Sequence, residues 1–223
     1  MFPMKFVLTA VLCLLFSCGA YAQAAQPALV TPLLTPYADP PFIVPVHEIK
    51  GIALLKALRA GGFVLYMRHA FAGSPKPPCP AESVLTEEGE AQARQVGAAL
   101  RELKIPIAVI RASETCRAKD TARLLGLGVV TTDADLNPAV MRSPVANDAE
   151  QFRYLMETPP PGSNTLLVSH VQGAQKLEDR ILIELAEVVV YQSRGNTKAE
   201  PVARIPLSAW AGLIAVAKAE PIP

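Results

Sequence analysis

Apolar residues recur at helical spacing over residues 49–58, and the Gly61-Gly62 pair that follows predicts the end of a helix. A continuous apolar run of strand length comes next, over residues 63–67, and it ends at Arg68-His69. Because apolar and polar residues do not alternate in this run, it is typical of a strand covered on both faces, as in a parallel sheet. This strand therefore presents an arginine and a histidine at its carboxyl end.

Strands and helices continue to alternate downstream. Helices are predicted over residues 86–103, from an N-cap at Ser113 to Gly126, over 148–156 and over 207–218. Strands are predicted over residues 105–110, 129–132, 165–169, 187–192 and 203–205, and the strand over 165–169 ends at His170. This order predicts an α/β fold, a three-layer α/β/α sandwich with a mostly parallel central sheet.

The first 22 residues have the order of a secretory signal. Lys5 precedes an apolar run over residues 6–16, and small residues follow as far as Ala22. The run is too short to span a bilayer in the usual way, so we expect cleavage near Ala22 and a periplasmic or secreted protein without a stable membrane span. A short membrane anchor and a lipoprotein signal that attaches lipid at Cys18 are the alternatives.

Proline marks the next part of the chain. Residues 23–46 contain six prolines, which predicts an extended arm that packs poorly. Residues 47–223 are then expected to form a single catalytic domain, because a chain of 223 residues can bury one substantial core.

The net charge bears on the expected partners, and the cysteines bear on disulfide formation. The formal net charge is +1 and basic residues do not cluster, so nucleic acid is not an expected partner. Once the signal is removed, Cys79 and Cys116 are the cysteines that remain. In an oxidising compartment these two can form a disulfide, and two buried thiols are the alternative.

Basic side chains follow the predicted strands. Two of the three histidines, His69 and His170, lie at strand ends, and Arg117 lies near the start of the predicted helix after another strand. Open α/β sheets place their sites at the carboxyl ends of strands, so we expect these residues and Arg68 to meet at one edge. Guanidinium groups match phosphate oxygens with paired hydrogen bonds. A phosphoryl group is therefore the expected occupant of the site.

Four segments, in order along the chain, resemble the motifs of the histidine phosphatase superfamily, which has the phosphoglycerate-mutase-like fold. They are residues 65–70, 85–97, 112–122 and 166–170. The cysteines at positions 79 and 116 give a looser similarity to exported members related to lipopolysaccharide-core heptose phosphatases.

The resemblance implies an exported phosphatase that works by two-step phosphoryl transfer. His69 would attack phosphorus and carry the phosphoryl group, while its other ring nitrogen donates to a backbone carbonyl. Arg68, Arg117 and His170 would hold the non-bridging oxygens. The resemblance implies no metal and no cofactor, and the substrate would be a phosphorylated small molecule or an envelope component.

The chain departs from the family pattern at the proton donor. Members that act on ordinary phosphate esters usually add a carboxylic acid, but here Asn137 follows Leu136 and Val171-Gln172 follows the second histidine. The candidates by proximity in sequence, with solvated surface charges as the alternative, are Asp133, Asp135, Glu184 and Glu187.

Without an acid the enzyme loses a contribution of about 10²–10⁴-fold in rate. It is then expected to be slow on alkyl phosphates and faster on phosphohistidine, acyl phosphates or aryl esters. Related exported members also tend to show Gln-Arg where this chain has Glu82-Ser83, so the same substrate is not expected. The rival hypothesis is a phosphate-recognising binding protein of the same fold, with weak turnover or none.

Overall fold

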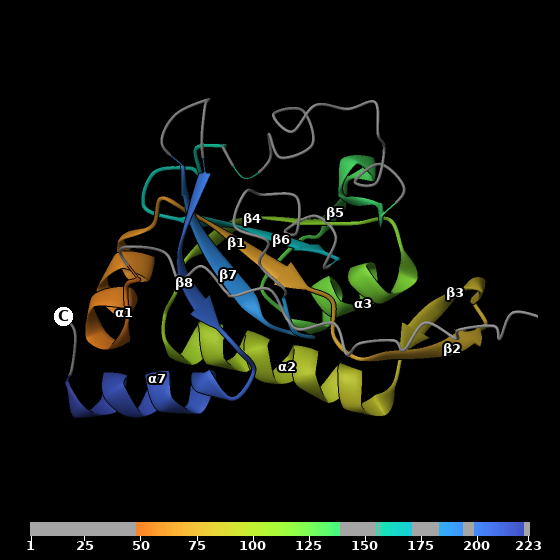
Figure 1. Cartoon of the computed structure of the whole chain (residues 1–223), viewed down its shortest axis with the longest axis horizontal. Helices are drawn as coiled ribbons and strands as arrows, with labels where there is room; N and C mark the ends of the chain where they lie inside the picture. Colours follow the sequence, from red (N-terminus) through yellow and green to blue (C-terminus); the bar gives the residue numbers. More distant parts are fainter. Residues whose placement is uncertain (1–47, 139–154, 156, 171–182, 194–198, 221–223) are drawn as a thin grey trace, which may run out of the picture. The chain divides into compact units, whose positions relative to one another are not determined.

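The computed structural model describes residues 48–138, 155, 157–170, 183–193 and 199–220 (Figure 1). The chain divides into two units, Met1–Asp39 and Pro40–Pro223, and all the described residues belong to the second. The predicted signal, the proline-rich arm and, apart from Leu155, the helix predicted over 148–156 lie outside them. No helix within the described ranges is long and apolar enough to cross a membrane.

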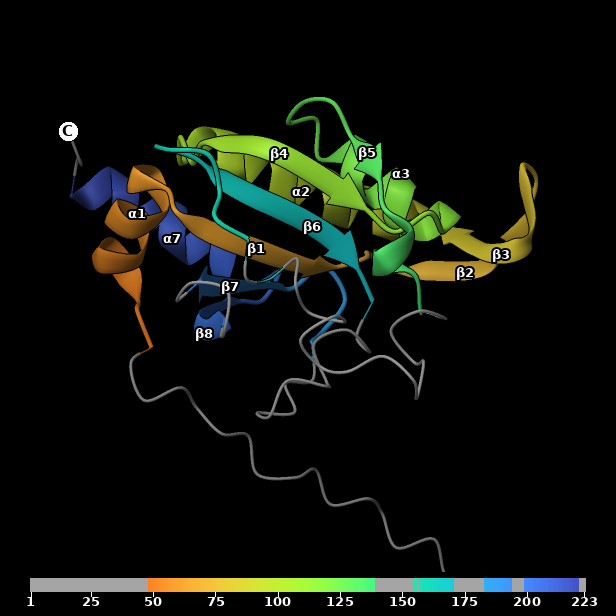
Figure 2. The ribbon, with the colours of Figure 1, turned by 90° about the horizontal axis from the view of Figure 1, so that it is seen from above.

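A six-stranded sheet forms the centre of the second unit, in the order β5-β4-β6-β1-β7-β8 (Figures 1 and 2). Four neighbouring strands are parallel: β5 (Thr131–Thr132), β4 (Ile107–Ala112), β6 (Asn164–Ser169) and β1 (Phe63–Arg68). Strand β7 (Val188–Ser193) is antiparallel to β1, and β8 (Ala199–Ile205) is antiparallel to β7. The predicted α/β class with a mostly parallel sheet is confirmed.

The two faces of β1 are buried in two separate apolar clusters, as its unbroken apolar sequence predicted. Phe63, Leu65 and Met67 pack with residues of four helices on one face, while Val64 and Tyr66 belong to a second cluster on the other face. The four helices are α1 (Gly51–Ala60), α2 (Glu87–Glu102), α3 (Cys116–Leu124) and α7 (Ala209–Ala219). They make one layer of the sandwich, and α2 and α7 lie along the sheet in both views (Figures 1 and 2).

Strand register brings the expected site residues to one edge. Arg68 of β1 is paired with Ser169 of β6, so the next residues, His69 and His170, leave adjacent strands at the same level. The His69 N–H donates to the Ser169 carbonyl at 2.9 Å, which extends the pairing past the end of β1. In the same way Ser113, after β4, donates its N–H to the carbonyl of Val168 at 2.9 Å.

Helix boundaries follow local signals with one exception. The Thr86 hydroxyl accepts the N–H of Gly89 and caps α2, close to the predicted start. Gly61 ends α1 with φ +82°, a conformation that favours glycine, and it also lies directly against the Ser163 backbone. The prediction of Ser113 as N-cap of α3 was wrong, because Thr115 occupies that position and the Ser113 hydroxyl is engaged in the site described below.

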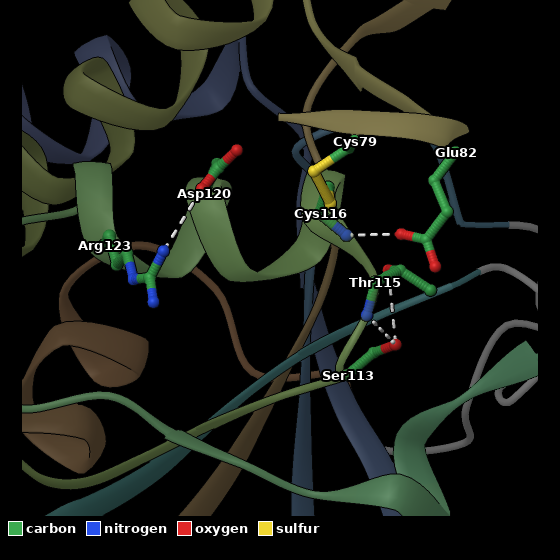
Figure 3. Close-up of a disulfide and its surroundings, with 7 residues drawn as sticks. All are labelled: Cys79, Glu82, Ser113, Thr115, Cys116, Asp120 and Arg123. Carbon is green, nitrogen blue, oxygen red and sulfur yellow. Dashed lines mark hydrogen bonds and ion pairs between the residues drawn. A yellow bond between two sulfur atoms is a disulfide. The ribbon is translucent and has the colours of Figure 1, made fainter. Parts of the chain in front are cut away.

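A two-stranded hairpin precedes α2 and was not predicted. It consists of β2 (Ala72–Lys76) and β3 (Cys79–Leu85), which are antiparallel and carry one proline each. A disulfide joins Cys79 in β3 to Cys116 at the start of α3 (Figure 3). Of the two alternatives open from the sequence, the structure therefore shows the disulfide.

Replacing both Cys79 and Cys116 by serine should lower the free energy of unfolding by about 2–4 kcal/mol, because the bond joins residues 37 positions apart. Urea denaturation of the oxidised protein and the variant measures this difference. Reductant should lower the midpoint of the wild-type protein and leave that of the variant unchanged. Equal midpoints for the two oxidised proteins would contradict the prediction.

Candidate active site

His69 is nearly buried, and its two ring nitrogens have different partners. Nδ1 lies 2.8 Å from the carbonyl oxygen of Ala70. Because a carbonyl oxygen can only accept, Nδ1 carries the proton and Nε2 keeps its lone pair. This is the backbone contact that the family resemblance implied, and it leaves Nε2 as the nucleophilic atom of the ring.

Arg117 joins the two histidines. Its Nε donates to Nε2 of His69 at 3.1 Å, and its Nη2 lies 3.2 Å from Nδ1 of His170. The two imidazole rings lie with their centroids 5.2 Å apart in an edge-to-face arrangement. A guanidinium can only donate, so Nδ1 of His170 accepts here and its Nε2 carries the proton.

A chain of hydrogen-bonded polar side chains contacts Nε2 of His170, the ring nitrogen that does not face Arg117. This Nε2 lies 3.0 Å from the hydroxyl of Ser113 and 3.3 Å from that of Thr115. The Ser113 hydroxyl donates to Oδ1 of Asn137 at 2.7 Å, and Nδ2 of Asn137 donates to Glu114 at 2.7 Å. Each partner limits the orientation of the next, so the network fixes which nitrogen of His170 faces Arg117.

Arg68 is the second guanidinium at this edge of the sheet. Its Nη1 donates to the carbonyl of Ile183 at 2.9 Å, while its Nε is buried and lacks a hydrogen-bond partner among the described residues. Burial, and next the positive charge of Arg117, lower the pKa of Arg68. Two like charges and an unsatisfied donor make this a place where an anion is stabilised.

The environment of His69 keeps its ring neutral. Burial lowers the pKa of His69 to about 4, and the charges of Arg117 and Arg68 act in the same direction. The hydrogen bond to Ala70 opposes them without reversing the shift. At neutral pH the imidazole is therefore unprotonated and can act as a nucleophile.

Two of the four acid candidates named from the sequence are held in ion pairs. Asp133 forms an ion pair with Arg111 at 3.2 Å, and the buried Glu187 accepts two hydrogen bonds from Arg204 at 2.7 and 2.8 Å. Asp135 lies in the short 3₁₀ helix η1 (Ala134–Leu136), and Glu184 is exposed. The carboxylates of Asp133 and Glu187 are therefore engaged in ion pairs rather than free to donate a proton.

Sequence reasoning missed three residues near the site. Ser113 was interpreted as a helix cap, Asn137 was noted only as the absence of an acid, and Glu82 only as a departure from related proteins. Oε2 of Glu82 accepts the backbone N–H of Cys116 at 2.8 Å (Figure 3). No local pattern could reveal these contacts, because each depends on long-range pairing of strands or on the hairpin.

Comparisons with known proteins agree with this geometry. The family described as the histidine phosphatase superfamily (branch 1) matches residues 68–138, a span that contains Arg68, His69 and Arg117. No curated protein matches the chain in sequence. Among the described residues, no group of three or more His, Cys, Asp or Glu is placed to hold a metal ion.

Solved structures are similar to this chain at low sequence identity. The protein histidine phosphatase SixA complexed with tungstate is 15% identical, with a TM-score of 0.52, covering 66% of this chain and 97% of its own. A phosphoserine phosphatase from Entamoeba histolytica in complex with 3-phosphoglyceric acid is 14% identical, with a TM-score of 0.47 and coverage of 65% and 96%. A mycobacterial glucosyl-3-phosphoglycerate phosphatase is 18% identical, with a TM-score of 0.42 and coverage of 59% and 91%.

The chain has an α/β fold, and residues 68–138 match the histidine phosphatase superfamily (branch 1). The family match and the shared fold confirm the resemblance to the histidine phosphatase superfamily and support a hydrolase of that class. His170 lies beyond the matched span and is placed at the site by the pairing of β6 with β1. The looser similarity to heptose phosphatases stays a prediction.

The pH dependence of catalysis should report the depressed pKa of His69. Because protonation removes the lone pair of Nε2, kcat/KM should rise with pH around a midpoint near 4 and stay level through pH 6.5. Titration of the imidazole by NMR should give the same midpoint in the resting protein. Arg117→Met should raise this pKa by removing a nearby positive charge, whereas Arg94→Met, on the exposed side of α2, should leave it unchanged. A midpoint near 6.5 in the wild-type protein would contradict the burial argument.

Ser113→Ala should impair the positioning of His170. Losing one neutral hydrogen-bond partner is expected to lower kcat/KM about tenfold and to change the NMR chemical shifts of the His170 ring. The matched control is Ser163→Ala, which removes a serine hydroxyl that donates to Pro160 away from the histidines. Equal kinetics for the two variants would show that the network does not act on His170.

Proposed function

We propose that the chain is an exported phosphatase that transfers a phosphoryl group to Nε2 of His69 and then to water. The observation that carries this proposal is the pairing of an unprotonated Nε2 with a guanidinium donor 3.1 Å away, at the end of the central strand. A metal and a cofactor are not required by the proposed steps, which use protein side chains and water.

In the first step, the lone pair of Nε2 forms a bond to phosphorus while the bond from phosphorus to the leaving group breaks. The electron pair of that bond leaves with the leaving group, so a poor leaving group needs a proton. Arg117, which contacts Nε2 in the resting protein, would donate instead to the non-bridging oxygens together with Arg68. His170 lies beside Arg117 and would act on the same oxygens.

In the second step, water attacks phosphorus and the bond to Nε2 breaks. The electron pair returns to Nε2 and the attacking water releases one proton to solvent, so the products are inorganic phosphate, this proton and neutral His69. The hydrogen bond from Nδ1 to Ala70 persists through both steps and keeps the ring in one orientation. The enzyme is thereby returned to its starting state.

The ease with which the leaving group departs limits the class of substrate. Since Asp133 and Glu187 are held in ion pairs, compounds whose leaving group departs without strong acid assistance are favoured. Acyl phosphates, phosphoramidates such as phosphohistidine, and aryl phosphates meet this condition. One structural neighbour is a protein histidine phosphatase, which agrees with the phosphoramidate class.

Export is part of the proposal. It is supported by the signal-like first 22 residues and by the Cys79–Cys116 disulfide, which suits an oxidising compartment. The second candidate function, a phosphate-binding protein with little turnover, is favoured by the ion-paired state of two of the acid candidates.

Turnover decides between the two functions. Mature protein, residues 23–223, should hydrolyse p-nitrophenyl phosphate and acetyl phosphate in the presence of a chelator. His69→Ala should reduce kcat by at least about 10³-fold, because the covalent route is lost, yet it should still bind inorganic phosphate through the two arginines. If the wild-type protein binds phosphate without turnover on either compound, the binding protein is the correct function.

A further inference from the structure

Glu82 is a carboxylate within electrostatic reach of the phosphoryl-binding arginine. Its Oε2 accepts the N–H of Cys116, the residue just before Arg117, at 2.8 Å (Figure 3). The charge of Glu82 raises the pKa of Arg117, although burial has the larger and opposite effect. The negative charge of Glu82 therefore acts on the guanidinium that contacts both His69 and His170.

Two links hold this carboxylate in place. Glu82 lies in β3, and the Cys79–Cys116 disulfide joins the same strand to the same end of α3 that receives the Glu82 hydrogen bond. Figure 3 shows the carboxylate and the disulfide on either side of the Cys116 backbone. The carboxylate is therefore held near the site by the hairpin, and its half-buried position limits screening by solvent.

Among the described residues, Arg68, Arg117 and Glu82 contribute to the charge that a bound phosphate ester would meet. Arg68 and Arg117 carry two positive charges, which match the two negative charges of a bound phosphoryl group. Glu82 adds a negative charge and forms no ion pair with a described residue. A positive charge on the leaving group of a substrate would be attracted by Glu82, whereas a second anion would meet repulsion.

This inference rests on the proposed function and concerns its substrate. We propose that Glu82 determines specificity by favouring phosphorylated compounds whose leaving group carries an ammonium group over those whose leaving group carries a carboxylate. Glu82 acts through its charge, so it is not assigned a role in proton transfer.

Two small phosphates of nearly equal size test the proposal. O-phosphoethanolamine carries an ammonium group and 2-phosphoglycolate a carboxylate. Their dissociation constants are measured by calorimetry on the mature His69→Ala protein, so that neither compound is consumed, with inorganic phosphate as the common reference. The ammonium compound should bind more tightly, and adding Glu82→Gln should reduce its advantage about three- to tenfold.

Glutamine keeps a side-chain oxygen that can accept the Cys116 N–H, so this variant separates charge from helix capping. The matched control is Glu102→Gln, which also removes one carboxylate charge. Glu102 is the last residue of α2 and pairs with Lys218 at 2.9 Å. The control should leave the ratio of the two dissociation constants unchanged. An unchanged ratio in Glu82→Gln, with phosphate still bound, would overturn the specificity role alone. Failure of inorganic phosphate to bind at all would instead overturn the phosphoryl site on which the proposal rests.

Discussion

The guanidinium of Arg117 contacts Nε2 of His69 and Nδ1 of His170 at once, so one side chain sets the relation between the two imidazoles. Its position depends on where α3 begins. The disulfide at Cys116 ties that end of α3 to the hairpin. Gly97 lets α2 approach the backbone just after α3 so closely that a Cβ atom would overlap it. The disulfide, the hydrogen bonds to the histidines and the packing of α2 therefore all restrict the position of Arg117.

This arrangement costs stability in the resting protein. Burial lowers the pKa of both Arg68 and Arg117, which means that the fold disfavours the charges it holds. The buried Nε of Arg68 has no hydrogen-bond partner in the described part of the chain. Unpaired charges and donors of this kind are typical of functional sites, where a bound anion offsets the cost. Burial, and next the charges of Arg117 and Arg68, lower the pKa of His69 and so keep its ring neutral.

The parts of the fold that the sequence predicted are those with local signals. The apolar run of β1 and the capped, periodic α2 were located to within about two residues, and the histidines at the ends of β1 and β6 followed from the parallel sheet. The β2–β3 hairpin could not be predicted, because its polar, proline-containing strands have no apolar alternation and are joined to α3 by the disulfide. Strand ends shifted where pairing overrode local apolarity, as in β4, which extends to Ala112.

The site was predicted in its main residues and missed in its supporting ones. Arg68, His69, Arg117 and His170 each belong to a segment that resembles a family motif. Ser113, Asn137 and Glu82 acquire their roles from the register of β4 against β6, from the position of η1 and from the hairpin. Such contacts join positions far apart in the chain, and sequence periodicity carries no information about them. The ion pairs of Asp133 and Glu187 could not be foreseen for the same reason, since their partners lie on other strands.

The central claim is that the phosphoryl group passes through Nε2 of His69, and the position of the phosphorus–nitrogen bond tests it most directly. The mature protein would be mixed with acetyl phosphate, quenched in alkali within one turnover, and studied by ³¹P–¹H correlation NMR and peptide mass spectrometry. The account predicts phosphohistidine at position 69 with phosphorus on Nε2, because Nδ1 is committed to Ala70. Phosphorus on Nδ1, on another residue, or on no residue while turnover proceeds would contradict it.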